Sequence, residues 1–189
     1  MHPMRIVAVG TLLAGIMLSQ AAAQKKSSSM GKLVERGKWL VNLGGCNDCH
    51  TPKKYGPKGI ELDETRLLSG APADEQVLPI PDAVGMGPDK WAAVTNAHFT
   101  TWAGPWGVSF AANLTPDVET GIGSWKEEMF IKALRTGKHL GEGRPILPPM
   151  PWENLAKVDD GDLKAIFAYL KSLPPIKNAV PEPIPPKGQ

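Results

Sequence analysis

The chain has 189 residues, of which 42% are hydrophobic and 21% are charged. This balance is typical of a globular domain and excludes a disordered or multi-span membrane protein. The net charge of +2 predicts no nucleic-acid partner, and two cysteines cannot form a disulfide framework for a chain of this size. The 20 glycines and 19 prolines predict long ordered loops.

Residues 1–23 have the pattern of a secretory signal peptide. Arg5 precedes an apolar run from Ile6 to Leu18, and Ala21–Ala23 offers a small-residue cleavage site. The run is too short to cross a bilayer comfortably. We therefore expect cleavage near Ala23 and a periplasmic or otherwise exported protein, with membrane attachment only if the segment stays uncleaved.

The first helix is expected near the start of the remaining chain. Residues 24–30 read as a flexible lead-in, and an apolar stripe over residues 33–43 predicts a helix that Gly44 and Gly45 end. Gly37 lies inside this helix, where it costs about 1 kcal/mol relative to Ala. It is either a tolerated defect or a place where another helix approaches closely.

Two further helices are predicted after a long irregular stretch. Residues 51–123 show no strong periodicity, and only 62–68 and 90–94 look locally helical; irregular stretches of this length are usually functional. A capping box at Ser124 and Glu127 then predicts a helix closed by Gly137. The last helix starts at an Asp159 or Asp160 cap and stops before Pro174. The Pro-rich tail, residues 174–189, is expected to run extended.

Cys46, Cys49 and His50 form a C-x-x-C-H motif, the signature of covalent haem c attachment. One helical turn places both thiols against the vinyl groups of one porphyrin edge, and the adjacent histidine reaches the iron. A bare C-x-x-C also occurs in redox dithiols, local disulfides and zinc sites. A helix rather than a strand precedes this motif, and the chain has no second cysteine pair for zinc. Haem attachment is therefore favoured, with one haem for the one motif.

Iron held by His50 needs a sixth ligand or an open position. Met150 lies in the rigid sequence PPMPW, and rigidity would keep a weak thioether on iron. Met86, His98 and His139 are the alternatives. Met129 is expected to pack in the core, and Met30 lies in the lead-in.

These features resemble a class I cytochrome c. The similarity is carried by CNDCH and by four further stretches: NLTPDVETGIGSW (113–125), ALRTGKH (133–139), PPMPW (148–152) and DLKAIFAYLKSLPP (162–175). They resemble the cytochrome c domains that serve exported dehydrogenases and respiratory chains. The resemblance implies an all-α domain over residues 31–173 with an enlarged, loop-rich insertion at 60–112. It also implies that the first and last helices cross, with Phe167, Tyr169 or Leu170 approaching Gly37.

The same resemblance implies a one-electron carrier rather than an enzyme. Its partners would be redox proteins such as a dehydrogenase, a cytochrome complex or a terminal oxidase. A His/Met ligand pair raises the reduction potential relative to bis-His and leaves no place for substrate. An open or displaceable sixth position would instead indicate a haem enzyme or a gas sensor.

Several further roles are expected around the haem. The ring of His50 should be oriented by a backbone carbonyl, for which Pro52 or Pro57 are candidates. The candidate donors to the haem propionates are Trp102, Trp106, Asn113, Trp125 and Arg144. Residues 24–58 carry eight Lys or Arg against two acidic residues. We expect the lysines flanking the motif to face a redox partner: Lys38, Lys53, Lys54 and Lys58.

Overall fold

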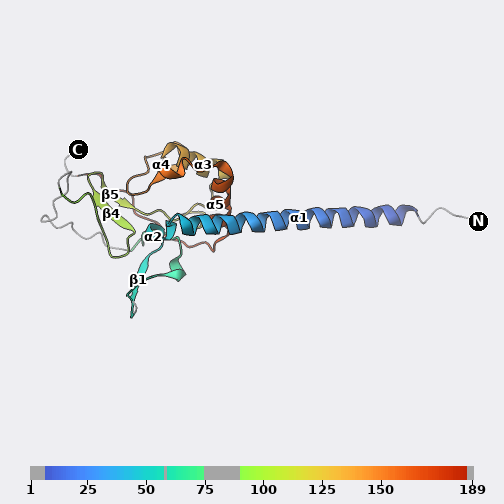
Figure 1. The fold of residues 1–189 in the computed structure, drawn as a ribbon, viewed down its shortest axis with the longest axis horizontal. Helices are drawn as coiled ribbons and strands as arrows, with labels where there is room; N and C mark the ends of the chain where they lie inside the picture. The colour runs from blue at the N-terminus through green and yellow to red at the C-terminus, as the bar shows by residue number, and fades with distance from the viewer. Residues whose placement is uncertain (1–6, 58, 75–89, 187–189) are drawn as a thin grey trace, which may run out of the picture.

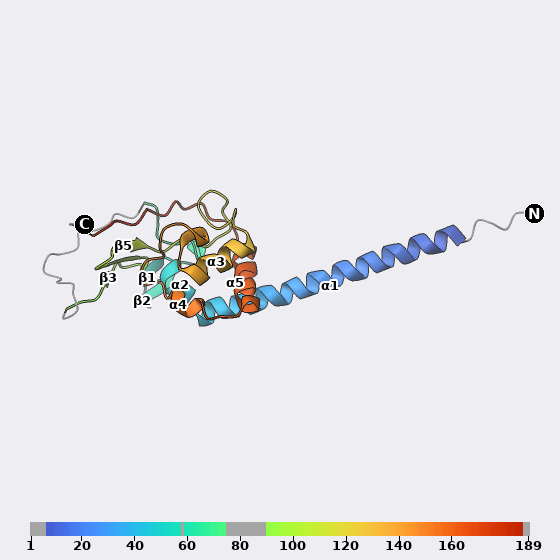
Figure 2. The ribbon, with the colours of Figure 1, turned by 90° about the horizontal axis from the view of Figure 1, so that it is seen from above.

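The computed structural model describes residues 7–57, 59–74 and 90–186, with only the backbone described for 7–23 and 26. Helix α1 (Val7–Leu43) is much longer than the expected first helix, and its N-terminal part extends away from the compact remainder of the chain (Figures 1 and 2). It continues without a break through Ala23 and through residues 24–30, which are helical rather than irregular. Within the described residues, no helix combines the length and apolarity needed to cross a membrane.

Helix α1 crosses α5 (Asp160–Ser172) at Gly37. A Cβ atom placed on Gly37 would lie 1.9 Å from the carbonyl oxygen of Ala165 and 2.8 Å from the Cβ of Tyr169. The two helices can approach this closely only because position 37 has no side chain. The structure therefore confirms the expected crossing, with Ala165 and Tyr169 making the contact. At its edge, the guanidinium of Arg36 and the carboxylate of Asp162 form an ion pair of 2.7 Å.

The apolar core lies between α1, α3 (Glu127–Thr136) and α5. The rings of Phe130 and Phe167 pack with their centroids 5.2 Å apart. The buried core cluster consists of Val41, Leu68, Ile122, Phe130, Leu134, Leu163, Ile166, Phe167, Tyr169 and Leu170. Residues far apart in the sequence, from Val41 to Leu170, thus contribute to one core.

The expected helix boundaries hold at α5 and partly fail at α3. The Asp159 carboxylate accepts a hydrogen bond of 2.8 Å from the Asp162 N–H, so the last helix is capped as predicted. Gly137 ends α3 in the left-handed conformation, with φ of 64°. The start of α3 was predicted wrongly, because Lys126 is the N-cap and no Ser124 capping box forms. The preceding loop is held by its own turn, in which Gly123 N–H donates to the Asp117 carbonyl.

The all-α expectation is incomplete, because two small antiparallel sheets lie between the C-x-x-C-H motif and α3. Residues 90–94, expected to be helical, instead lead into a strand, while residues 64–66 within the other expected segment form the short 3-10 helix η1 (Glu64–Arg66). The first sheet is a hairpin of β1 (Lys53–Gly56) and β2 (Gly59–Leu62). The second sheet has the order β3 (Val94–Thr95), β4 (Thr101–Gly104) and β5 (Gly107–Phe110).

Between α3 and α5 the chain forms the short 3-10 helix η2 (His139–Gly141) and the short helix α4 (Trp152–Leu155). After α5 the described tail is extended and returns across the insertion (Figure 2). Ile184 pairs with Val108 of β5, and the side-chain amide of Asn178 donates to the Ser69 and Ala71 carbonyls at 2.7 and 2.8 Å. The tail therefore fastens the insertion to the helical core.

Candidate haem site

The three residues of the motif lie on one short helix, α2 (Cys46–His50). Gly45 precedes it with a φ of 63°, a conformation that favours glycine, and so lets the chain turn directly from α1 into α2. Cys46 and Cys49 are half-buried, whereas His50 is buried. The one-turn geometry that covalent haem attachment needs is therefore present.

His50 is oriented by a distant part of the chain. Its Nδ1 lies 2.8 Å from the carbonyl oxygen of Ala112. Because a carbonyl only accepts, Nδ1 carries the proton and Nε2 keeps the lone pair with which a neutral histidine binds a metal. Burial lowers the pKa of His50 and so favours this neutral form. The expectation that Pro52 or Pro57 would supply the carbonyl is wrong; the acceptor is the last residue of the insertion, 62 positions after His50, where no local pattern reveals it.

The two thiols do not have the properties of a redox dithiol. Burial raises the pKa of Cys46 to about 11. Burial also raises the pKa of Cys49, although the Lys53 charge and the Trp102 side chain act in the opposite direction. Reactive C-x-x-C thiols have lowered pKa values instead. Among the described residues, no group of three or more His, Cys, Asp or Glu side chains could hold a metal ion, so a zinc site has no support either.

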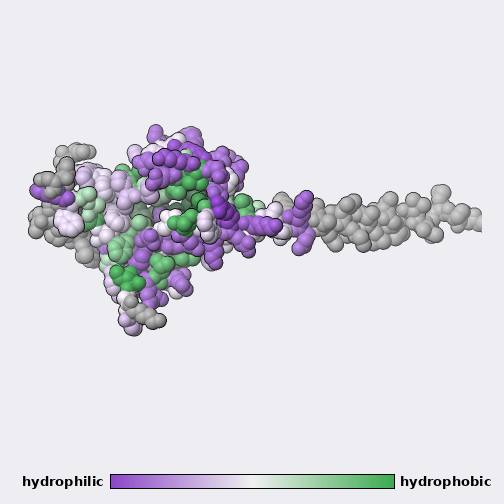
Figure 3. Space-filling view, in the orientation of Figure 1, coloured by the Kyte–Doolittle hydropathy of each residue, from purple (hydrophilic) through white to green (hydrophobic). Residues whose placement is uncertain are grey.

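Met150 lies close to the core in a tight turn. Its N–H bonds the Leu147 carbonyl at 3.3 Å, and its own carbonyl accepts from the Trp152 N–H at 2.9 Å. Met150, Cys46 and Trp125 all pack against the same core cluster while remaining partly exposed. Figure 3 shows apolar side chains reaching the surface between hydrophilic regions of the compact part. These partly buried side chains, together with the two cysteines and the neutral His50 on α2, are the kinds of residue that hold haem c.

The other predicted pocket residues have partners within the chain. The indole N–H of Trp102 donates to the Phe99 carbonyl at 3.0 Å, and that of Trp106 donates to the Ser109 hydroxyl at 3.2 Å. Roles as propionate donors remain predictions for all five residues. Three of them make other contacts: Asn113 with Thr115 and the Ile176 carbonyl, Trp125 edge-on with His139, and Arg144 with Glu182 at 3.5 Å.

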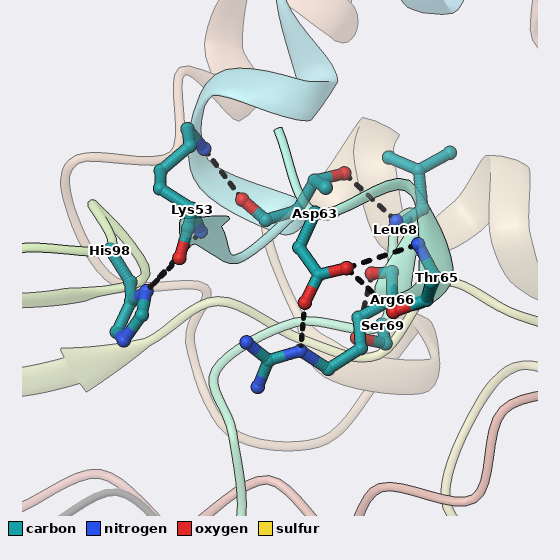
Figure 4. Close-up of polar contacts among 8 residues, drawn as sticks. Lys53, Asp63, Thr65, Arg66, Leu68, Ser69 and His98 are labelled. Atoms are coloured by element: carbon teal, nitrogen blue, oxygen red, sulfur yellow. Dashed lines mark hydrogen bonds and ion pairs between the residues drawn. The ribbon is translucent and has the colours of Figure 1, made fainter. Parts of the chain in front are cut away.

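The histidines and methionines other than His50 and Met150 lie in several different parts of the structure. Nδ1 of His98 lies 2.6 Å from the backbone carbonyl oxygen of Lys53 (Figure 4). The ring of His139 meets that of Trp125 edge-on. Met30 is exposed and Met129 is half-buried on α3. Met86 lies outside the described residues.

The expectation that Lys53 faces a redox partner is wrong, because its side chain is buried. Only 7% of its surface is exposed, and its ammonium donates to three backbone carbonyls of the motif region. Lys53 therefore cannot be part of an exposed docking face. Lys38 and Lys54 are exposed as expected, and Lys58 lies outside the described residues.

Hydrogen bonds below α2 join it to the segment after β2. The buried Thr51 hydroxyl donates to the Asn47 side chain at 2.9 Å and accepts from the Leu68 N–H at 2.9 Å. In Figure 4 the Asp63 carboxylate lies among Thr65 and Arg66 and caps η1. These contacts, like those of Ala112, were not visible in the sequence pattern.

Several relatives of this chain are subunits of dehydrogenases. A nicotinate dehydrogenase subunit of Pseudomonas putida is 29% identical over 149 residues, which cover 79% of this chain and 9% of the relative. The cytochrome c subunit of a quinone alcohol dehydrogenase of Gluconobacter oxydans is 35% identical over 103 residues, 51% of this chain and 21% of the relative. The gluconate 2-dehydrogenase cytochrome c subunit of Pantoea cypripedii is 29% identical over 148 residues, 78% of this chain and 25% of the relative.

The chain resembles cytochrome c subunits of dehydrogenases. This confirms the resemblance inferred from the motifs, although no protein-family model matches the chain. The chain spans between about a tenth and a quarter of the length of these three relatives. A further relative, from Cereibacter sphaeroides, is described as a dihaem cytochrome c. Similarity to cytochrome c subunits implies haem c and supports a role in electron transfer.

Proposed function

We propose that this chain is a class I cytochrome c domain carrying one haem c. Cys46 and Cys49 would form the thioether bonds to the haem, and His50 and Met150 would bind its iron. The observation that carries the proposal is the His50–Ala112 hydrogen bond, because it fixes the ring in the tautomer that leaves Nε2 for iron.

The protein residues have separate tasks in this proposal. When bound, haem c supplies a one-electron Fe(III)/Fe(II) couple. His50 is held by a neutral backbone acceptor, and the backbone at Met150 is held in a turn by two hydrogen bonds. A methionine thioether that binds the iron together with His50 would favour the ferrous state and so raise the reduction potential. With both axial positions filled, the domain carries electrons and is not itself an enzyme.

The proposed setting is an exported electron-transfer chain. The signal pattern of residues 1–23 supports cleavage near Ala23 and a periplasmic location. Three relatives are cytochrome subunits of alcohol, gluconate and fructose dehydrogenases, which supports a dehydrogenase as electron donor. A cytochrome complex or a terminal oxidase would then be the electron acceptor.

The test is expression in a host that attaches haem to C-x-x-C-H motifs. We expect haem that resists acid-acetone extraction and a protein mass increased by one haem. The ferric protein should show the weak near-infrared absorbance band of methionine-ligated iron. The Cys46→Ser, Cys49→Ser double variant is the control and should lack covalent haem.

Two results would contradict the proposal. Freely extractable haem in the unchanged protein would exclude thioether attachment. Covalent haem without the near-infrared band, combined with rapid carbon monoxide binding, would instead indicate a haem enzyme or a gas sensor.

A further inference from the structure

The Lys53 side chain is directed at the helix that carries the motif. Lys53 begins β1, three residues after His50, and its ammonium donates to the carbonyls of Asn47, Asp48 and Thr51 at 3.0, 2.9 and 2.5 Å. Two of these carbonyls lie between the two cysteines, and the third directly follows His50. In Figure 4 the Lys53 side chain stands beside the ribbon of the motif helix, and a dashed line joins its ammonium to a backbone carbonyl oxygen.

The ammonium adds a cationic donor at the end of α2, where the Asn47 carbonyl also accepts a hydrogen bond from the Thr51 N–H. The last carbonyls of a helix have no intrahelical donor and carry partial negative charge, so a cation there is favourable. Within the described part of the chain, no carboxylate forms an ion pair with Lys53. Carbonyl dipoles therefore hold the ammonium directly. Burial lowers the pKa of Lys53, and the nearby Asp48 charge acts in the opposite direction.

A buried cation at this position interacts with the charge of the iron in the proposed haem site. Reduction adds one electron to the iron site and lowers its charge by one. A fixed positive charge nearby disfavours the ferric state more than the ferrous state, and so raises the reduction potential. Because the ammonium is shielded from solvent, added salt screens this effect less than it screens a surface charge.

We propose that Lys53 is a positioning residue of the haem site, which holds the C-x-x-C-H turn through three carbonyls and raises the reduction potential through its buried charge. This inference rests on the proposed cytochrome function. It assigns a function to the residue that follows Thr51 and Pro52, outside the motif itself.

The test compares four variants of the haem-loaded protein. Lys53→Gln removes the charge and keeps a hydrogen-bond donor, Lys53→Met removes both, and Lys53→Arg keeps the charge. Lys54→Gln is the matched control, because Lys54 is the next residue on the same strand and is exposed. The measurements are the midpoint potential at low and high ionic strength, the haem content and the near-infrared band.

We expect Lys53→Gln and Lys53→Met to have lower midpoint potentials than the unchanged protein, and the difference to persist at high salt. Lys53→Arg should stay closer to the unchanged protein, and Lys54→Gln should differ little, with any shift removed by salt. Loss of haem or of the band in Lys53→Met but not in Lys53→Gln would support the positioning part. If neither neutral variant takes up haem, the midpoint potential of Lys53→Arg is the deciding measurement, because this variant keeps the positive charge. A midpoint potential well below that of the unchanged protein would then overturn the proposal that the charge raises the potential.

Equal potentials for the unchanged protein, Lys53→Gln and Lys53→Met, with haem and band intact, would also overturn the inference. That result would leave the proposed function untouched. If the unchanged protein itself carries no covalent haem, the proposed function fails instead. The two failures are therefore distinguishable in one set of samples.

Discussion

The Ser109 hydroxyl donates a hydrogen bond to the carbonyl oxygen of Pro148 over 2.6 Å. Ser109 is a buried residue of β5, and Pro148 lies two positions before Met150. The same hydroxyl accepts from the indole N–H of Trp106. The insertion between the motif and α3 is thus bonded to the loop that carries the proposed methionine ligand, which gives this added segment a physical role.

Replacing Ser109 by Ala should loosen the Met150 loop. The substitution leaves the Pro148 carbonyl and the Trp106 indole without this partner, at a cost of about 1 kcal/mol per lost hydrogen bond. We expect haem to stay attached, the near-infrared band to weaken and carbon monoxide to bind faster. Ser172→Ala is the control, because Ser172 also donates to a backbone carbonyl, that of Tyr169, within α5. If both variants bind carbon monoxide at the unchanged rate, the loop does not depend on Ser109.

Met150→Ala should open the sixth iron position without releasing the haem. The thioether bonds and His50 remain, so haem content stays the same, while the reduction potential falls because the methionine ligand is lost. Carbon monoxide or cyanide titrations and a redox titration measure the two effects. Met129→Ala, at a half-buried position on α3, should leave both unchanged. If Met86→Ala reproduces the effects and Met150→Ala does not, the insertion supplies the ligand.

The parts of this site that the sequence predicted are those that depend on local spacing. Cys46, Cys49 and His50 are adjacent on one turn, and a single short motif specifies them. Contacts formed through the tertiary fold were not predicted: Ala112 follows His50 by 62 positions, and Ser109 precedes Pro148 by 39. Backbone carbonyls carry no side-chain signal, so no pattern could mark Ala112 as the acceptor.

The fold shows the same division. Asp159 was one of two candidate caps, because capping requires a particular residue type locally. Gly37 alone left two interpretations open, and the resemblance to class I cytochromes c implied the helix crossing there. The strands of the insertion are only two to four residues long, too short for an alternating pattern to stand out. The burial of Lys53 was not predicted, because a lysine in a basic segment is expected to be exposed to solvent. Only the folded structure shows the backbone carbonyls that its ammonium binds.

Gly37→Ala should destabilise the haem-loaded protein. The added Cβ would lie 1.9 Å from the Ala165 carbonyl, so α1 and α5 must separate, and overpacking of this kind costs roughly 1–3 kcal/mol. Denaturant unfolding followed by near-ultraviolet circular dichroism gives the change in the free energy of unfolding. Gly31→Ala is the control on the same helix, because no atom lies within 4 Å of its added Cβ. That variant should be neutral or slightly more stable, since Ala favours the helix by up to about 1 kcal/mol; equal losses in the two variants would exclude the crossing as the cause.

Folding is expected to depend on haem attachment. Cys46, Trp125 and Met150 border the core but stay partly exposed, so the described residues leave apolar surface for a cofactor to cover. The Cys46→Ser, Cys49→Ser variant should therefore lose its near-ultraviolet signal and unfold without a cooperative thermal transition. A sharp, native-like transition in that haem-free variant would show that the chain folds by itself.

The exposed lysines beside the motif should attract a redox partner to this face of the protein. Lys38 and Lys54 are exposed, whereas Lys53 is buried against backbone carbonyls of the motif region. Charges of this kind act on the rate of encounter more than on affinity. The electron-transfer rate with the physiological partner should fall as ionic strength rises from about 0.01 to 0.15 M, because the screening length shortens from about 30 to 8 Å. Lys54→Glu should lower the rate at low salt and flatten this dependence while leaving the potential nearly unchanged.

Lys157→Glu is the control for Lys54→Glu, because it makes the same charge change on the exposed segment between α4 and α5, away from the motif in sequence. The electron-transfer rate of this variant should keep its dependence on ionic strength. An electron-transfer rate that does not change with ionic strength, or that rises with it, would exclude docking through these lysines.

In that case the hairpin that carries Lys54 offers an apolar contact for the partner instead. Tyr55 and Ile60 are cross-strand partners on β1 and β2 and are 61% and 51% exposed. The hairpin stands out beside α2 in Figure 1, so Ile60→Ser would then slow electron transfer where Lys54→Glu does not.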